Sequence, residues 1–396
     1  MATPAPSSDD DVKLATELGI PTNPLKRVFR RFSNFAISFS TISVLTGTVL
    51  LYGYGLKFAG PVVNTVGWPL ASVLTLCVAA SMAEIASAYP TAGGLYYWAH
   101  RLGDARWAWF TGWLNMVGQV TMTAAVNFAA AMYLIGAVTR GFGLSTVPIL
   151  GCAPTNWYFQ VLVMTAITIP QVIINVCSVR LVRALNDLSV FWHVCGVLLI
   201  VVLLLSLGTH RNGWSFLVST ATPVTPLEAS SADLGRGTTD AALVVGEFAY
   251  PSPLFGLVPG LRSLYGASPF VLVFLLALLQ AQWTYTSYDA AAHLAEETVD
   301  AGRSSALGIF QSVAVSAVVG YVLLLVLTLS IPGGDVASTA KHPYPVLHIV
   351  SENLRGHPRL ADLIAVAIGG AMWLCGLASI TSMSRMWYAV ARDDGI

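Results

Sequence analysis

The chain has 396 residues, of which 55% are hydrophobic and only 10% are charged, and its formal net charge is zero. An ordinary soluble domain carries about 25% charged residues, and a soluble protein this apolar would expose large apolar patches. The composition therefore argues against a large soluble protein with buried helices, and the balanced charge offers no basic surface for a nucleic acid. We expect an all-α integral membrane protein that is surrounded by a lipid bilayer.

The first 31 residues are predicted to form a cytosolic tail, and residues 32–396 a transmembrane domain. The tail is polar and lacks the charged-then-apolar order of a cleaved signal peptide. It ends in a tight basic cluster, which comprises Lys26, Arg27, Arg30 and Arg31. Basic residues favour the cytosolic side of a membrane. We therefore expect the N-terminus to lie inside the cell, and we assign the chain to the plasma membrane rather than to an internal membrane.

Eight long runs that carry no Asp, Glu, Lys or Arg follow the tail. A helix needs about 20 mainly apolar residues to cross a bilayer. The runs predict eight spanning helices at residues 34–56, 66–89, 107–138, 157–178, 188–207, 268–294, 306–331 and 360–390. The five cysteines include no CxxC pair, and the seven histidines are scattered. We therefore predict no metal site, no cofactor and no enzymatic activity.

Two of these spans contain polar residues where a plain membrane helix would be apolar. The first has a Ser/Thr-rich stretch from Ser38 to Thr48, and the sixth ends in a polar and aromatic stretch from Gln280 to Asp289. Such side chains are costly against lipid, so both stretches should face protein or a water-filled cavity. Secondary transporters bind substrate where helices are broken near the middle of the bilayer, whereas Ser, Thr and Gly also serve simple helix packing. Inverted five-helix repeats would put these two spans in corresponding positions.

Three longer motifs resemble those of a known family. They are SMAEIASAYPTAGGLYYW at residues 81–98, GWLNMVGQ at 112–119 and WTYTSYDAAAHLAEET at 283–298. In this order they resemble the amino acid–polyamine–organocation superfamily and, within it, the amino acid, choline and GABA permeases. The resemblance implies a LeuT-like fold with an inverted repeat. It also implies a permease that moves amino acids or related amines, such as GABA or choline, by proton coupling or by exchange.

The resemblance implies a substrate site between the two interrupted helices. Thr46, Gly47 and Thr48 resemble the unwound turn of the first span, which holds a substrate carboxylate. The matching break in the sixth span meets the substrate ammonium, and it comprises Thr284, Tyr285, Thr286, Ser287 and Tyr288. Relatives often have Gly-x-Gly in the first break and glycine at the position of Ser287. The side chains added at these positions should narrow the pocket. The identity of the substrate therefore cannot be transferred from relatives to this chain.

The resemblance also implies residues for gating and proton coupling. Trp283 is similar to a gating aromatic residue of related exchangers, and Asp289 resembles an acidic position implicated in proton sensing. Asn186 and Asp187, followed by His193, resemble the Asn-Asn…Lys spacing of proton-coupled relatives, whose lysine lies where sodium binds in sodium-driven ones. An imidazole titrates near neutral pH, so His193 is a candidate proton carrier. The alternative is a histidine that is hydrogen-bonded to a neighbouring helix.

Glu84, at the inner end of the second predicted span, has two interpretations. Its carboxylate either holds an inner gate closed through a neighbouring helix or is solvated at the membrane boundary. The charged residues after the sixth span are interpreted as an ordinary cytosolic loop; they are Glu296, Glu297, Asp300 and Arg303. Of these five residues, Glu84 is therefore the gating candidate.

The chain ends shortly after the eighth predicted span, whereas members of this family normally continue into four further helices. We therefore expect a fold truncated after the eighth of twelve helices, either as a fragment or as a chain that partner chains complete. The alternatives to a transporter are a non-transporting amino acid receptor on the same fold and an inactive transporter fragment. A channel is disfavoured because the sequence shows no filter-like repeat and no charged pore ring.

Overall fold

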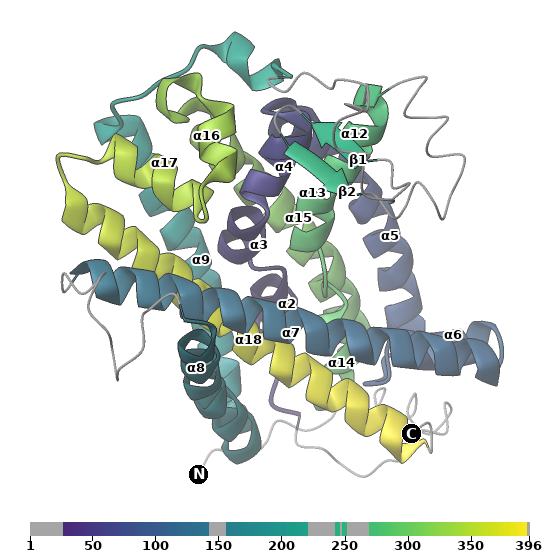
Figure 1. Cartoon of the computed structure of the whole chain (residues 1–396). Helices are drawn as coiled ribbons and strands as arrows, with labels where there is room; N and C mark the ends of the chain where they lie inside the picture. Colours follow the sequence, from purple (N-terminus) through teal and green to yellow (C-terminus); the bar gives the residue numbers. More distant parts are fainter. Residues whose placement is uncertain (1–26, 142–155, 221–241, 246–247, 252–268, 394–396) are drawn as a thin grey trace, which may run out of the picture.

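The computed structural model describes residues 27–141, 156–220, 242–245, 248–251 and 269–393 (Figure 1). Within these ranges, seven helices are long and apolar enough to cross a membrane. They run over Arg31–Leu50, Val63–Ala88, Ala105–Val138, Trp157–Cys177, Val179–Leu207, Ala301–Leu329 and Pro358–Arg392. The predicted all-α membrane fold is therefore confirmed.

The first predicted span consists of three helical pieces. They are α2 (Arg31–Ile42), α3 (Val44–Leu50) and α4 (Tyr52–Ala59). A π-helical turn, η1 (Val63–Gly67), leads into α5 (Trp68–Ala88), which is the second span. The short helix α6 (Leu95–Leu102) then precedes the long helix α7 (Ala105–Gly141). The first span is thus interrupted where its sequence is polar, whereas the apolar second span is continuous.

The middle of the chain contains two spanning helices and a small hairpin. The helices are α8 (Trp157–Cys177) and α9 (Val179–Leu207), and a 3-10 turn, η2 (Trp214–Val218), follows them. Strands β1 (Ala242–Val245) and β2 (Phe248–Pro251) pair antiparallel, with Ala242 opposite Pro251. α9 begins nine residues before the predicted span 188–207, because charged residues continue the helix beyond its apolar part.

The sixth predicted span, 268–294, is interrupted as predicted and consists of short helical pieces. They are α12 (Pro269–Ala277), α13 (Leu279–Thr284) and α14 (Ala290–His293), and the turn η3 (Ala295–Glu297) follows. The chain continues through α15 (Ala301–Leu329), the turn η4 (Pro332–Gly334), α16 (Val336–Lys341), α17 (Pro345–Asn353) and α18 (Pro358–Arg392). The first half of the polar stretch Gln280 to Asp289 belongs to α13, and its second half, residues 285–289, is the segment between α13 and α14.

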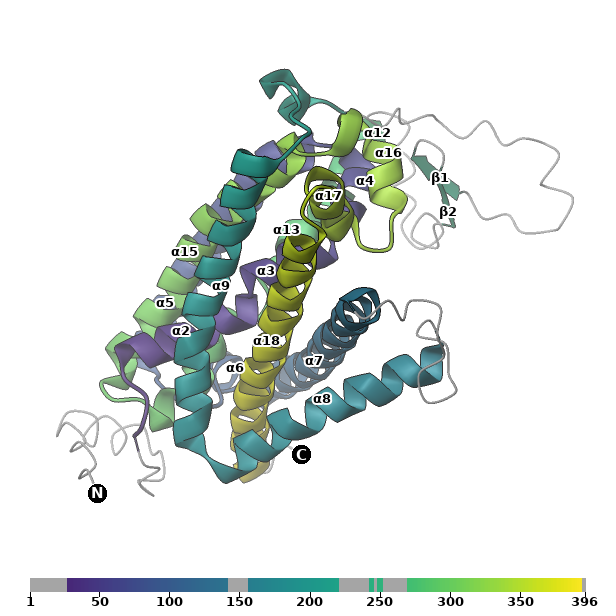
Figure 2. The same ribbon diagram turned by 90° about the vertical axis from the view of Figure 1, so that its left-hand side faces the viewer.

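The helices form two packed groups around the first span. Helices α2, α5, α9 and α15 pack on one side, helices α7, α8 and α18 on the other, and α3 lies between them (Figure 2). Most residues of α2, α3 and α18 are buried, whereas α5 and α8 expose apolar side chains on their outer faces. The Ser/Thr-rich stretch of the first span therefore faces protein at the centre of the bundle, where its hydroxyl groups find partners.

Candidate functional site

The first span is broken at Ser43, between α2 and α3. Ser43 has φ 46° and ψ 78°, in the left-handed region that costs a residue with a side chain about 1 kcal/mol or more. Its side chain has partners on both sides of the break. The Oγ atom lies 2.6 Å from His193 Nε2 of α9, and it donates to Thr46 Oγ1 at 2.5 Å. These two hydrogen bonds stabilise the break and place a histidine next to it.

The predicted position of the unwound turn, Thr46 to Thr48, is wrong. Thr46, Gly47 and Thr48 are helical residues of α3, and Thr48 Oγ1 donates back to Val44 O at 2.5 Å. Gly47 is instead a packing position, because a Cβ atom there would lie 2.6 Å from Thr284 Cγ2 and 2.7 Å from Thr284 Cα. The reason for the glycine is therefore the close approach of α3 to α13 rather than backbone freedom.

The sixth span is broken between α13 and α14, as predicted. Ser287 in this break has φ 63°. Two hydroxyl groups of α2 bind its main chain: Ser38 Oγ donates to Tyr288 O at 2.8 Å, and Thr41 Oγ1 donates to Ser287 O at 2.9 Å. A helix end leaves carbonyl groups without a partner in the helix. The polar stretch of the first span thus supplies these partners to the break in the sixth.

Replacement of Ser287 by glycine is expected to raise the free energy of unfolding by about 1 kcal/mol, because glycine adopts a positive φ without strain. Little is lost, since the described contact of Ser287 Oγ is a 3.9 Å approach to Met122 Sδ. Thermal unfolding in detergent measures the effect. Ser43→Gly is the contrasting variant, because it relieves a similar strain but removes the bonds to His193 and Thr46. A lower unfolding temperature for Ser287→Gly would contradict the prediction.

Two of the predicted site residues in the sixth span pack against neighbouring helices. Tyr285 points toward α5, where its hydroxyl lies 2.5 Å from Ser72 Oγ and its ring centroid 5.0 Å from that of Trp68. Thr284 is buried against Gly47 of α3. Both residues therefore hold the break in place rather than line open space beside it.

The other predicted residues of the sixth span are half-buried; they are Trp283, Thr286, Ser287 and Tyr288. Thr286 Oγ1 donates to Trp283 O at 2.8 Å, which closes the end of α13. The rings of Trp283 and Tyr288 pack against the edge of the main core without entering it fully. These partly exposed side chains are the ones that a ligand at the break could reach.

Asp289 directly follows the break and contacts a histidine that the sequence analysis missed. His293 is fully buried, its Nε2 lies 3.3 Å from Asp289 Oδ2, and its Nδ1 lies 2.9 Å from Ala92 O. His293 Nδ1 faces a carbonyl oxygen and therefore carries a proton, whereas Nε2 lies between the Asp289 carboxylate and the Gln119 side-chain amide. The spacing of four residues between Asp289 and His293 is the signal by which the sequence could have revealed the pair.

The three motifs that carry the family resemblance meet at His293. From the first motif, Gly94 has φ 50°, and a Cβ atom there would lie 2.8 Å from His293 Cε1. From the second, Gln119 Nε2 lies 3.3 Å from His293 Nε2. Asp289 belongs to the third, together with His293 itself. The glycine is thus needed both for its positive φ and for the room that it leaves to the ring.

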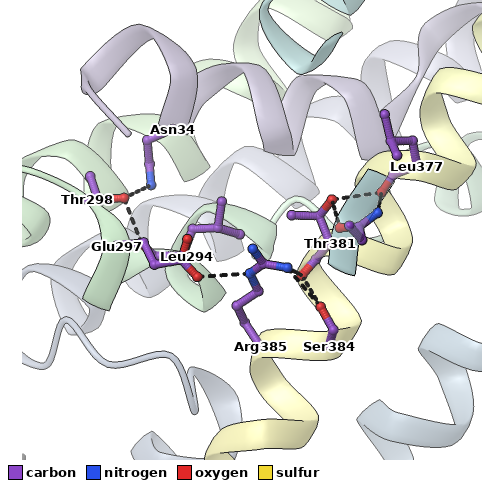
Figure 3. A network of polar contacts seen from close by, with 9 residues as sticks. Asn34, Leu294, Glu297, Thr298, Leu377, Thr381, Ser384 and Arg385 are labelled. Carbon is purple, nitrogen blue, oxygen red and sulfur yellow. Dashed lines mark hydrogen bonds and ion pairs between the residues drawn. The ribbon is translucent and has the colours of Figure 1, made fainter. Parts of the chain in front are cut away.

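A polar network closes the end of the bundle where α2 begins and α18 ends, which we call the inner end (Figure 3). Arg385 Nε donates to Glu297 Oε1 at 3.0 Å, and their side chains are 14% and 11% exposed. Arg392 Nη1 donates to Glu296 Oε2 at 2.9 Å. The interpretation of Glu296 and Glu297 as an ordinary loop is therefore wrong. The tight turn η3 directs both carboxylates toward α18, whose arginines lie far away in the sequence.

Glu84 is exposed on α5. Within the described part of the chain, its carboxylate takes part in no ion pair, and its carbonyl accepts from Ser87 Oγ at 2.7 Å. This position agrees with the solvated alternative. A gating role for Glu84 stays a prediction, whereas the carboxylates of η3 have the cross-helix partners that a gate requires.

The segment before α2 is part of the same closure. Glu297 O accepts from the backbone N–H groups of Val28 and Phe29 at 2.9 and 3.0 Å, and Val299 N donates to Phe29 O at 3.0 Å. Arg183 Nη1 of α9 donates to Val28 O at 3.0 Å. The last residues of the predicted tail are therefore fixed to the chain that follows the sixth span.

A cavity of about 230 Å³ lies at the inner end, between α14, η3 and α18. It is lined by Ala92, His293, Glu296, Glu297, Ser384, Arg385 and Tyr388. The ring of His293 and the Glu297–Arg385 ion pair thus border the same space.

The chain is a multi-pass membrane protein with two discontinuous helices that contact each other inside a bundle of apolar spanning helices. Discontinuous helices of this kind are typical of secondary transporters. The model of the amino acid permease family matches residues 29–396. The chain therefore belongs to the amino acid permease family, a family of transporters rather than of enzymes. The resemblance inferred from the three motifs is confirmed.

Individual relatives agree with this assignment. The chain is 33% identical to amino-acid permease BAT1 of Arabidopsis thaliana over 385 residues, which are 94% of this chain and 66% of the relative. It is 32% identical to the BAT1 homolog of Oryza sativa subsp. japonica, with the same coverage. Identity to the GABA-specific permease of Saccharomyces cerevisiae is 26%, over 99% of this chain and 61% of that protein. The chain thus spans about two thirds of the length of the curated relatives that it matches.

Proposed function

We propose that the chain acts as an amino acid permease, which moves amino acids or related amines such as GABA or choline across the plasma membrane. The observation that carries the proposal is the direct contact between the two broken helices. Ser38 and Thr41 of α2 bind the main chain of the break in the sixth span, and Gly47 of α3 contacts Thr284 of α13. Secondary transporters bind substrate where such broken helices meet. Two relatives, one named an amino-acid permease and the other a GABA-specific permease, support the same class.

The proposed site suits a zwitterion. Thr48 Oγ1 donates to Val44 O, so we assign the substrate carboxylate to Thr46 Oγ1, in the first turn of α3 after the break at Ser43. The ammonium group would lie at the break in the sixth span. There the half-buried rings of Trp283 and Tyr288 offer aromatic faces to a cation, and Trp283 also serves as the proposed gating residue.

Ligand binding and transport test the proposal separately. The unfolding temperature of the purified chain is recorded with amino acids, GABA, choline and polyamines. A ligand at about 100 times its dissociation constant adds roughly 2.7 kcal/mol of apparent stability. Accumulation or exchange of the ligand in proteoliposomes supports a permease. Binding without either supports the receptor alternative, and a folded sample without any shift contradicts the proposal.

We further propose that His193 carries the coupled proton. The ring is fully buried beside the break in the first span, with Nε2 2.6 Å from Ser43 Oγ. His193→Gln keeps the polarity but cannot carry the proton, so it is expected to abolish uptake driven by a pH gradient and to spare exchange. His100→Gln, at an exposed position of α6, is the matched control. Uptake by His193→Gln that keeps its pH dependence would refute this role and leave a packing histidine.

A further inference from the structure

A row of three polar side chains crosses the break in the first span. His193 Nε2 lies 2.6 Å from Ser43 Oγ, and Ser43 Oγ lies 2.5 Å from Thr46 Oγ1. All three side chains are buried. Each hydroxyl group has one proton to donate. Which hydroxyl group donates and which accepts along the row therefore depends on whether the imidazole of His193 donates to Ser43 or accepts from it.

The second nitrogen of the imidazole determines what the first one does. His193 Nδ1 lies 2.7 Å from Ser189 O, and a carbonyl oxygen only accepts, so Nδ1 carries a proton. Nε2 then accepts a hydrogen bond from Ser43 when the ring is neutral and donates one when the ring is protonated. Ser43 Oγ and Thr46 Oγ1 are close enough for either hydroxyl group to donate to the other, so the direction of this bond follows from the protonation of the ring.

We propose that Ser43 is a positioning residue that converts protonation of His193 into binding of the substrate carboxylate by Thr46. When His193 is protonated, Ser43 donates to Thr46, and the Thr46 hydroxyl donates to the carboxylate. When His193 is neutral, Ser43 donates to Nε2 and Thr46 donates to Ser43. Thr46 then presents lone pairs to the carboxylate and repels it. The inference rests on the proposed function, because it requires the carboxylate to lie at Thr46.

The surroundings of the row leave the proton on His193 as its variable charge. Phe39 of α2 meets the imidazole edge-on, with 6.0 Å between the ring centroids. From α18, the thiol of Cys375 contacts the row: its Sγ donates to Thr41 O at 3.3 Å and lies within hydrogen-bonding reach of Ser43 Oγ. On α9 itself, Asp187 lies six residues before His193 and accepts from Ser33 of α2. The described hydrogen bonds and ion pairs bring no other ionisable side chain from α2, α3, α15 or α18 to the ring.

Binding that is linked to a proton depends on pH, and the linkage is reciprocal. The carboxylate favours protonated His193, so affinity for a carboxylate ligand should fall as pH rises. A hydrogen bond to a charged group corresponds to roughly ten-fold or more in affinity. We therefore expect GABA and alanine to bind at least about ten-fold more weakly at high than at low pH. Propylamine and ethylamine, which lack the carboxylate, should bind without this dependence.

The experiment measures dissociation constants of these four probes between acidic and mildly basic pH, with the full chain in nanodiscs. Ser43→Ala cuts the row and should make GABA and alanine binding independent of pH. Ser189→Ala is the matched control, because it also removes a serine hydroxyl group next to the ring, on the Nδ1 side. It keeps the carbonyl oxygen that Nδ1 faces, so its binding of GABA and alanine should depend on pH as in the wild-type chain. Thr46→Val leaves Ser43 in place but removes the hydroxyl group assigned to the carboxylate, so GABA and alanine should bind weakly to it at every pH. This variant tests the inference if Ser43→Ala does not fold.

The outcomes separate this inference from the proposed function. A Ser43→Ala or Thr46→Val chain that keeps the wild-type pH dependence overturns the relay and leaves the permease intact. The same holds if the wild-type chain binds GABA or alanine equally at every pH. If none of the four probes binds to the folded chain at any pH, both the proposed site and the relay are overturned.

Discussion

Replacement of Gly47 by alanine is expected to lower the free energy of unfolding by about 3 kcal/mol and to abolish ligand binding. The added Cβ atom would lie 2.6 Å from Thr284 Cγ2 and 2.7 Å from Thr284 Cα. One of these atoms belongs to the main chain, so a rotation of the threonine side chain does not relieve the contact. Helix α3 must move away from α13, which separates the two breaks. Chemical unfolding and ligand binding in detergent measure both effects.

Gly118 provides the matched control for this variant. A Cβ atom at Gly118, in the long helix α7, would meet nothing within 4 Å. Gly118→Ala should therefore be neutral or stabilise the helix by about 0.5–1 kcal/mol. Thr284→Ala on the Gly47→Ala background should restore only part of the stability, because the contact with Cα remains. Equal effects of Gly47→Ala and Gly118→Ala would show that the close approach of the helices is unimportant.

Glu297→Gln is expected to destabilise the closed inner end by about 3 kcal/mol, because it leaves the charge of Arg385 nearly buried without its partner. Ser384 lines the adjoining cavity, so a cysteine at this position reports opening. On a background without native cysteines, Ser384→Cys should react several times faster with a membrane-impermeant thiol reagent when Glu297 is replaced. The unfolding temperature should fall in parallel.

An exposed ion pair supplies the control for this effect. Arg355 pairs with Glu352, but its side chain is 72% exposed. Exposed pairs contribute about 0–1 kcal/mol, so Glu352→Gln should change stability little. Exchanging the two charges, with Glu297→Arg and Arg385→Glu together, should restore part of the closure. Unchanged labelling and stability in Glu297→Gln would mean that other contacts hold the inner end.

The long helices could be predicted from the sequence because a bilayer imposes a simple condition on length and polarity. The position of the first break could not. Several Ser and Thr residues follow one another there, and side chains of this kind can bond to the local main chain and favour a break at any of them. What selects Ser43 is the imidazole of His193, which approaches from a helix 150 residues later. A partner in another helix, rather than the local sequence, decides which residue leaves the helical conformation.

The inner end escaped prediction for a related reason. Glu296 and Glu297 follow a membrane helix, where charged residues are normally solvated. Their partners Arg392 and Arg385 lie 96 and 88 residues later. Only the packing of α18 across the bundle brings them together. The contact between Asp289 and His293 is different, because both residues lie on one short stretch of chain and the helical spacing alone predicts it.

The backbone bridge between Phe29 and Thr298 joins two segments that the sequence separates by most of the chain. A displacement of Val28 and Phe29 is transmitted through peptide groups, not through flexible side chains, to the turn η3 and the residues that follow it. The segment before α2 and the segment around η3 are therefore expected to move together. The contacts of Phe29 thus connect the segment before α2 to the ion pairs that close the inner end.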